Sequence, residues 1–335
     1  MQPEDESRWD SFVNTCTNAT FFHKAGWKTV IERSFGHKTF FLYAQSNGEI
    51  VGVLPLAQVK SVLFGHSLSG LPFCVYGGVA SHSDAAKIAL TKKAQELTAE
   101  LNVGYLELRN REPQNTDWIS KDLYVTFRKS IDPDEETNML AIPRKQRAMV
   151  RKGIKENLVS EIDQNIDRFY FAYASSVHNL GTPVFSKKYF RILKEVFKDD
   201  CEILTIVKEK EVISSVLSFY FKDEVLPYYG GGTSRARAVA GNDFMYWELM
   251  RRACARGYKI FDFGRSKRGT GAFDFKKNWG FEAEPLHYEY LLHANSSLPE
   301  NNPLNPRYQR FIQLWRRMPL PLANFIGPFI VKNLG

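Results

Sequence analysis

The sequence predicts an α+β protein made of two similar domains, and three observations support this fold class. Both halves of the 335-residue chain show the same order of a hairpin, a strand that leads to Gly-Gly, a helix and a further strand. The same number of residues separates Gly77 from Tyr105 and Gly230 from Tyr258. The chain is also rich in phenylalanine (25) and tyrosine (15), which fits a core that contains β-sheet. Internal duplication accounts for this agreement; the alternative is a chance likeness between two generic α+β units.

In the first half, Asn47-Gly48 separates two β-type runs, which is the strongest short-range signal for a hairpin. Apolar residues recur at helical spacing from Ile88 to Leu101. The predicted elements of this half are helices over 7–16 and 22–35, strands over 38–44, 50–59 and 75–79, a helix over 83–102 and a strand over 105–109.

The second half repeats this order, with a Glu-Lys-Glu turn in place of Asn-Gly. Asn242 or Asp243 suits the N-cap of its third helix, and Gly257 suits the position after that helix ends. Each domain is expected to hold a mixed, mostly antiparallel sheet flanked by helices. The predicted elements of this half are helices over 167–178 and 186–197, strands over 202–208 and 212–221, a strand that ends at 232, a helix over 243–255, a strand over 258–263 and a short helix from about 272.

Positive charge is concentrated in two runs. The formal net charge is +8, and residues 144–155 contain six basic residues before any acid. Residues 251–277 contain nine basic residues against Asp262 and Asp274. Such runs are usually solvated helix faces, but two of them make a polyanionic partner a serious alternative. We expect a first domain at 1–143, a second at 144–295 that carries the catalytic segment, and a basic amphipathic segment at 296–335.

The segment Phe261–Phe281 is the most informative part of the chain. A strand ends near Gly264, a loop with three basic residues and two more glycines follows, and a short helix then carries Lys276 and Lys277. Backbone N–H groups at a helix start, reached by a glycine-rich turn and surrounded by cations, attract anions. Phosphates, carboxylates and developing oxyanions are all candidates. The first half lacks an equivalent loop, so chemistry is expected in the second domain.

This segment resembles part of the GCN5-related N-acetyltransferase (GNAT) fold. Residues 272–281, Ala-Phe-Asp-Phe-Lys-Lys-Asn-Trp-Gly-Phe, are similar to its terminal helix, which ends in an aromatic residue and Gly-Phe. The loop of that fold which cradles the pyrophosphate of coenzyme A corresponds to Thr233–Asn242. This loop keeps Arg237 and Gly241 but lacks a second glycine at the expected spacing. The resemblance therefore implies two tandem GNAT-like domains in which the coenzyme A loop has degenerated.

A tandem pair of this kind is similar to the Fem-type peptidyltransferases, and most closely to the FemAB-related group associated with exopolysaccharide and PEP-CTERM sorting loci. Four stretches carry the likeness: the basic helix at 143–152, Gly-Thr-Pro-Val-Phe-Ser at 181–186, Tyr-Tyr-Gly-Gly at 228–231, and Phe-Asp-Phe-Gly with Phe-Lys-Lys-Asn-Trp-Gly at 261–280. The resemblance implies transfer of an amino acid from aminoacyl-tRNA to an amine on a peptidoglycan or exopolysaccharide precursor, without a metal or a bound cofactor.

The resemblance assigns the stabilisation of the oxyanion to Lys276, with Lys277 as second choice because adjacent helical residues point about 100° apart. A solvated lysine pair is the alternative. Asp262, at a strand end, could orient the loop arginines or accept a proton, although a structural ion pair is the preferred interpretation. These three residues are the predicted catalytic set.

Seven further residues are predicted to bind substrate. The basic loop residues suit phosphate capture or simple solvation, and the basic residues of the junction helix suit a nucleotide or tRNA backbone or solvation. The tyrosine could line a cleft or lie in the core. The set comprises Arg265, Lys267, Arg268, Tyr229, Arg144, Arg147 and Arg237.

The end of the chain differs in character, since Arg307–Gly335 contains five basic residues, no acid and a long apolar string. This composition fits peripheral contact with an anionic membrane surface, or a tail packed over the first domain. No signal peptide and no apolar run of membrane-spanning length are present, so we expect a cytoplasmic monomer, with a peripheral position at the inner face of the membrane as the alternative. A coenzyme A-dependent N-acetyltransferase and a non-catalytic nucleic-acid-binding module are the alternative functions.

Overall fold

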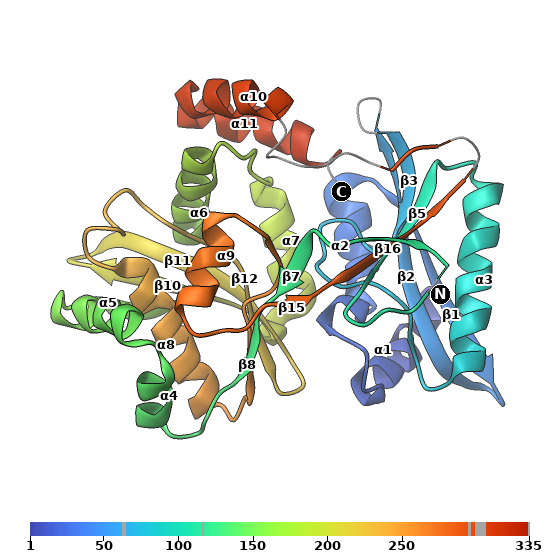
Figure 1. The fold of residues 1–335 in the computed structure, drawn as a ribbon, viewed down its shortest axis with the longest axis horizontal. Helices are drawn as coiled ribbons and strands as arrows, with labels where there is room; N and C mark the ends of the chain where they lie inside the picture. The colour runs from blue at the N-terminus through green and yellow to red at the C-terminus, as the bar shows by residue number, and fades with distance from the viewer. Residues whose placement is uncertain (62–64, 116, 294–295, 299–305, 334–335) are drawn as a thin grey trace. The chain divides into compact units, whose positions relative to one another are not determined.

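The computed structural model describes residues 1–61, 65–115, 117–293, 296–298 and 306–333 (Figure 1). The chain divides into two compact units, called unit 1 and unit 2 below. They differ from the predicted ranges in that 125–143 falls in unit 2 and 285–295 in unit 1. Unit 1 comprises Met1–Tyr124, Pro285–Asn301 and Lys332–Gly335, and unit 2 comprises Val125–Glu284 and Asn302–Val331.

Unit 1 is built on a seven-stranded sheet in the order β1-β2-β3-β5-β16-β6, with β4 paired to β2. Neighbouring strands are antiparallel except for β3 and β5, which are parallel. Side chains of β2, α3 and β5 share a hydrophobic core. The elements are η1 (Pro3–Asp5), α1 (Glu6–Thr15), η2 (Phe21–His23), α2 (Gly26–Phe35), β1 (Lys38–Ser46), β2 (Glu49–Ser61), β3 (Gly65–Ser69), β4 (Ala80–Ser81), α3 (Asp84–Glu100), β5 (Tyr105–Asn110), β6 (Ile119–Lys121) and β16 (His287–Leu292).

Unit 2 is built on a six-stranded sheet in the order β8-β13-β12-β11-β10-β9. Only the β12–β13 pair is parallel among the pairings described for this sheet. The chain enters the unit within β7 (Tyr124–Thr126) and leaves it within β15 (Glu284–Pro285). The other elements are β8 (Arg128–Ser130), α4 (Glu135–Ala141), α5 (Arg144–Lys155), β9 (Val159–Asp163), α6 (Asp167–Leu180), α7 (Lys187–Phe197), η3 (Lys198–Asp200), β10 (Cys201–Lys208), β11 (Glu211–Phe221), β12 (Glu224–Gly232), α8 (Gly241–Ala255), β13 (Ile260–Asp262), β14 (Ser266–Lys267), α9 (Gly271–Asn278), α10 (Pro306–Arg317) and α11 (Leu320–Val331).

The two hairpins match in detail. In β1–β2 the turn residues Asn47 and Gly48 have φ angles of 51° and 85°, and in β10–β11 Glu209 and Lys210 have 50° and 71°. Positive φ at both central residues favours the strand twist of a tight hairpin. Each hairpin also has a register shift at the same place before its turn, between Ala44/Gln45 and between Ile206/Val207. These shared irregularities support the predicted duplication more strongly than element order alone.

Each sheet is completed by a strand from a distant part of the sequence. In unit 1, β16 lies antiparallel to β5, although it follows the second repeat in the chain. In unit 2, β8 lies antiparallel to β13, although it precedes that repeat. The repeats have therefore exchanged a strand, which explains why the compact units depart from the predicted domain ranges.

Two local predictions fail. Residues 75–79 do not form a strand; instead, the N–H of Gly77 donates to the carbonyl oxygen of Arg109. An added Cβ at Gly77 would lie 2.0 Å from the carbonyl oxygen of Gly70, so this close backbone approach requires glycine. In unit 2, α8 begins at Gly241 after Ala240, which has φ of 54°. Asp243 therefore lies inside the first turn and not at the N-cap.

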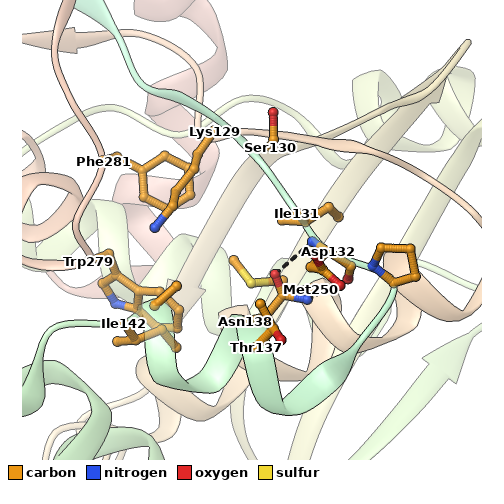
Figure 2. A pocket seen from close by; sticks show the side chains of 12 residues that line it. Lys129, Ser130, Ile131, Asp132, Thr137, Asn138, Ile142, Met250, Trp279 and Phe281 are labelled. Carbon is orange, nitrogen blue, oxygen red and sulfur yellow. Dashed lines mark hydrogen bonds between the residues drawn. The ribbon is translucent and has the colours of Figure 1, made fainter.

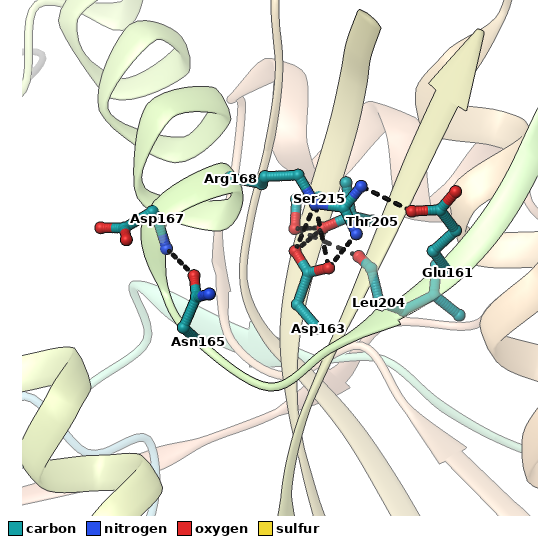
Figure 3. Close-up of polar contacts among 8 residues, drawn as sticks. All are labelled: Glu161, Asp163, Asn165, Asp167, Arg168, Leu204, Thr205 and Ser215. Carbon is teal, nitrogen blue, oxygen red and sulfur yellow. Dashed lines mark hydrogen bonds and ion pairs between the residues drawn. The ribbon is translucent and has the colours of Figure 1, made fainter. Parts of the chain in front are cut away.

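A buried polar network joins edge strand β9 to the rest of the sheet in unit 2 (Figure 3). The carboxylate of Asp163 accepts hydrogen bonds from Arg168 Nε at 3.0 Å and from Thr205 Oγ1 at 2.8 Å. Thr205 is also 2.7 Å from Ser215 Oγ on β11, and both hydroxyl residues are fully buried. Arg168 further pairs with Glu161 on β9. The network satisfies polar groups that would otherwise be costly to bury.

Asp163→Ala is therefore expected to destabilise unit 2 by about 2–3 kcal/mol, because Thr205 and Arg168 lose a charged acceptor. Denaturant unfolding followed by circular dichroism measures the change. Asp167→Asn is the matched control, since this nearby carboxylate is 64% exposed and forms a surface ion pair with Lys187. It should shift the free energy of unfolding by less than about 1 kcal/mol. Equal effects of the two substitutions would contradict the role given to the network.

The C-terminal helices α10 and α11 pack against α6 in unit 2 (Figure 1). An added Cβ at Gly181, which follows α6, would lie 2.4 Å from Ile312 of α10, so the contact is close. An added Cβ at Gly327 of α11 would lie 2.9 Å from the backbone nitrogen of Val184. Among the described residues, none of the helices combines the length with the apolar character that a membrane span requires.

Candidate active site

The site is formed by the segment from β13 through the loop to α9, in unit 2. The loop needs glycine at Gly264 and Gly269, which have φ of 66° and 74°. Thr270 caps α9, because its hydroxyl accepts from the N–H of Phe273 at 3.4 Å and donates to the carbonyl oxygen of Lys267 at 2.8 Å. The glycine loop and the short helix that the sequence predicts are therefore both present.

The side chain of Lys276 turns back from α9 into this loop. Its amine donates to the carbonyl oxygen of Gly264 at 2.8 Å and to that of Arg265 at 3.0 Å. It also lies 5.8 Å from the centre of the Phe127 ring. Burial lowers the pKa of Lys276 to about 7, opposed by the negative charge of Asp262 and assisted by the positive charge of Arg265. The amine is thus poised to change charge near neutral pH.

Asp262, the last residue of β13, is completely buried below the same loop. Its carboxylate accepts from the N–H of Gly264 at 2.7 Å and from Thr126 Oγ1 at 3.2 Å. It also forms an ion pair with Arg128 Nε at 3.4 Å. These contacts fix the first turn of the loop, whose carbonyl groups hold Lys276. The preferred interpretation of Asp262 as a structural ion pair fits this position.

Aromatic packing orients α9 so that only one lysine turns inward. Phe275 and Trp279 pack beside Tyr246 and Phe263 in the core of unit 2. Lys276 points into the loop, whereas Lys277 is exposed. This arrangement agrees with the expectation that adjacent lysines cannot share one direction, and it leaves Lys276 as the candidate for chemistry.

The three basic residues of the loop occupy different environments. Arg265 is half-buried, and its backbone carbonyl faces the amine of Lys276. Lys267 lies in β14 and is only 9% exposed, which leaves it poorly placed to capture a phosphate from solvent. Arg268 is exposed. Of the predicted phosphate-binding trio, Arg265 and Arg268 remain accessible to a ligand.

The other predicted substrate-binding residues lie on different elements. Tyr229 on β12 is 8% exposed, and its hydroxyl is 2.9 Å from that of Tyr189 on α7, within a cluster of aromatic rings. This packing fits the core interpretation of Tyr229. Arg144 and Arg147 lie on α5 and line a groove of about 550 Å³ with Arg151, Lys152 and Lys155. The groove is almost entirely basic.

The loop between β12 and α8, which carries Arg237, does not fit a pyrophosphate cradle. The N–H groups of Ala236, Ala238 and Gly241 donate to carbonyl oxygens of the loop itself. Ala236, Val239 and Ala240 are buried, so apolar side chains fill its interior. Arg237 is exposed.

No group of three or more His, Cys, Asp or Glu side chains that could hold a metal ion occurs in the part of the chain that the structure describes.

A small cavity of about 270 Å³ lies beside the end of α9 (Figure 2). Its wall is largely apolar and includes Trp279 and Phe281, but not Lys276. The amine of Lys129 points from β8 towards these two rings, and burial lowers the pKa of Lys129. Asn138 closes the opposite side and accepts from the N–H of Asp132 at 2.8 Å. The cavity is therefore separate from the lysine amine at the glycine loop.

Sequence reasoning missed three residues that surround the site. Thr126 ends β7, Phe127 follows it and Arg128 begins β8, and each contacts Asp262 or Lys276. Arg128 also pairs with Glu224 on β12. They lie more than a hundred residues before Asp262 and Lys276 and match no motif, so it is the pairing of β8 with β13 that brings them to the site.

Residues 142–277 match the protein family described as "Acetyltransferase (GNAT) domain". Comparison with curated protein sequences finds no match. Among solved structures, the fold is similar to that of FemX, with a TM-score of 0.65 and 15% identity over 93% of this chain and 98% of that chain.

Two further structures share the fold. One is the C-terminal domain (DUF2156) of a protein named as a lysylphosphatidylglycerol synthetase from Agrobacterium fabrum, with a TM-score of 0.60 and 11% identity over 87% of this chain and 92% of that chain. The other is a tandem GNAT protein from the clavulanic acid biosynthesis pathway, with a TM-score of 0.55 and 13% identity over 88% of this chain and 97% of that chain. The predicted α+β fold of two tandem GNAT-like domains is confirmed. The second half of the chain thus contains a stretch that matches a GNAT-type acetyltransferase domain, within a fold shared with tandem GNAT proteins.

Proposed function

We propose that the protein transfers an aminoacyl group to an amine on a cell-envelope precursor, either of peptidoglycan or of an exopolysaccharide. The enclosed amine of Lys276 at the glycine loop carries this proposal, because acyl transfer needs fixed positive charge beside a developing oxyanion. The FemX fold and the Fem-like motifs of the sequence support the choice of substrates. The GNAT-type domain supports the reaction class.

The proposed reaction begins when the acceptor nitrogen attacks the carbonyl carbon of the donor ester. A C–N bond forms and the carbonyl oxygen takes the negative charge. An ammonium has three N–H groups, and Lys276 donates two of them to the carbonyl oxygens of Gly264 and Arg265 among the described contacts, which leaves the third for the oxyanion. The C–O bond to the donor then breaks, and the proton lost by the attacking nitrogen passes to the leaving hydroxyl group.

The donor is proposed to be an aminoacyl-tRNA and not acetyl coenzyme A. Backbone N–H groups of the β12–α8 loop donate to carbonyl oxygens of the same loop, so few of them remain to bind a pyrophosphate. The groove on α5 instead offers Arg144 and Arg147 with three further cations, and a row of cations suits a phosphate backbone. Arginine binds phosphate oxygens in a bidentate manner. Both features favour a nucleic-acid-linked donor.

The test compares two labelled donors, a mixture of aminoacyl-tRNAs and acetyl coenzyme A, for binding and for transfer to amine acceptors. We expect binding of aminoacyl-tRNA that weakens steeply with added salt, together with transfer of the label to the acceptor. Saturable binding of acetyl coenzyme A without tRNA binding would refute the donor. Binding of tRNA that is equally tight when deacylated, with no transfer, would instead indicate a nucleic-acid-binding module.

The double substitution Arg144→Gln and Arg147→Gln should weaken tRNA binding and reduce the slope of its salt dependence by about two. Lys92→Gln on α3 of unit 1 is the control, because Lys92 is an exposed cation that does not line the groove on α5. An unchanged salt slope in the double variant would show that these two arginines of α5 do not bind the donor.

A further inference from the structure

The helix α11 exposes its large apolar side chains and buries its small ones. Ala323, Gly327 and Val331 form the face that is turned into unit 2, and Gly327 lies against the backbone of Val184. On the other side, Phe325 is 70% exposed and Phe329 is 59% exposed. The usual pattern of a surface helix is the reverse, with large apolar residues turned inward. The outer face of α11 is therefore built for an apolar environment outside the unit.

The neighbouring helix α10 adds positive charge and further apolar surface. Trp315 is buried and anchors the helix, whereas Leu314 is 67% exposed and Phe311 is 40% exposed. Arg310 and Arg317 are exposed on the same helix. The side chain of Arg307 lies outside the described residues.

No Asp or Glu occurs in the sequence between residues 302 and 335. A partner of this surface is thus expected to be apolar in its interior and anionic at its edge.

We infer that α10 and α11 together form a docking surface for an anionic lipid bilayer. Bilayers combine an apolar interior with negative headgroups, which matches exposed phenylalanines beside arginines. With 12 residues, α11 is about 18 Å long, too short to cross a hydrocarbon core of about 30 Å, so it lies in the plane of the surface. This inference goes beyond the proposed reaction and does not depend on the donor or on Lys276.

The contributions of charge and of apolar contact can be separated by lipid composition. Each cation near an anionic surface strengthens binding about fivefold, so the loss of two is worth about 30-fold. Partial insertion of two phenylalanines is worth about 10-fold or more. Charge acts only on anionic vesicles, whereas apolar insertion acts on neutral vesicles as well.

The experiment is co-sedimentation of the full chain with vesicles of phosphatidylcholine alone and of equal parts phosphatidylcholine and phosphatidylglycerol. We expect binding to the mixed vesicles and weak binding to the neutral ones. Phe325→Ser with Phe329→Ser should weaken binding to the mixed vesicles at least 10-fold. Ile88→Ser is the matched control, because Ile88 is 66% exposed on α3 of unit 1, and it should leave binding unchanged.

A second pair tests the charge without altering the apolar face. Arg310→Gln with Arg317→Gln should weaken binding to the mixed vesicles about 30-fold and leave binding to neutral vesicles unchanged. Arg316 is left intact because it donates to the carbonyl oxygen of Leu180.

Two results would overturn the inference. One is equal affinity of the unaltered protein for both kinds of vesicle. The other is self-association that Phe325→Ser and Phe329→Ser abolish while vesicle binding persists, since the face would then join two copies of the chain.

Discussion

The Lys276→Ala enzyme is expected to turn over about 10²–10³-fold more slowly than the unaltered enzyme, because one preorganised donor to the oxyanion is lost. Its free energy of unfolding should change by only about 1 kcal/mol, since the two hydrogen bonds to loop carbonyls are offset by removal of a desolvated ammonium. Steady-state transfer rates and denaturant unfolding measure the two effects. A fold-intact variant with an unchanged rate would remove Lys276 from the mechanism.

Lys277→Ala is the matched control for this substitution, because Lys277 is the exposed neighbour on the same helix. It should keep the rate within about twofold of the unaltered enzyme, in line with the small effect of a solvated cation. A large loss of rate in Lys277→Ala with none in Lys276→Ala would show that Lys277, and not Lys276, stabilises the oxyanion.

The pH dependence gives a further readout of the same residue. The pKa of Lys276 is lowered to about 7, and the ammonium is the form that stabilises an oxyanion. The rate at saturating substrate should therefore be highest at pH values below this pKa and should decline as the pH rises through about 7. Lys276→Arg stays charged over this range, so the decline should disappear even if the rate is lower throughout. A decline that persists in Lys276→Arg would belong to another group.

Asp262→Asn is expected to have the largest effect on stability, with a loss of about 3 kcal/mol in the free energy of unfolding. The residue is completely buried and carries the charge that faces Arg128, whose side chain is only 13% exposed. The amide oxygen of asparagine could still accept from Thr126 and Gly264, which both donate to Oδ1. The amide carries no charge, however, so Arg128 would lose the carboxylate oxygen Oδ2 that faces it. Denaturant unfolding measures the loss.

The same substitution should act on the rate through Lys276. Asp262 raises the pKa of Lys276, so its loss should move that pKa below about 7 and shift the decline of the rate to lower pH. Asp274→Asn is the control, since Asp274 is an exposed carboxylate in the first turn of α9 and should cost less than about 1 kcal/mol. An unaltered pH profile in a folded Asp262→Asn enzyme would show that the charge of Asp262 does not set the pKa of Lys276.

The sequence was sufficient for features that depend on local pattern. The hairpin at Asn47-Gly48 and the glycine loop before α9 follow from turn chemistry, which acts over a few residues. The repeat itself was visible from element order. The choice of Lys276 over Lys277 needed both the helical period and the family resemblance, and the inward turn of Lys276 agrees with it.

Local pattern failed where distant chain segments decide the outcome. Residues 75–79 have β-type side chains, yet the backbone of Gly77 approaches Gly70 too closely for a regular strand. Likewise, Asp243 looks like a helix cap, but the helix starts at Gly241 and the carboxylate is buried against Gln146 and Trp279. In both places the packing of another segment overrides the local preference.

The α+β class, the order of the elements and the choice of the segment proposed to carry the chemistry could therefore be read from the sequence, because they depend on short-range periodicity and turn residues. Which strands complete each sheet and which groups surround the lysine became clear from the three-dimensional structure. The pairing of β8 with β13 brings Arg128 to Asp262, and the fold of the loop encloses the amine of Lys276. Burial and charge in that enclosure set its pKa, and such long-range effects of solvation leave no pattern in the sequence.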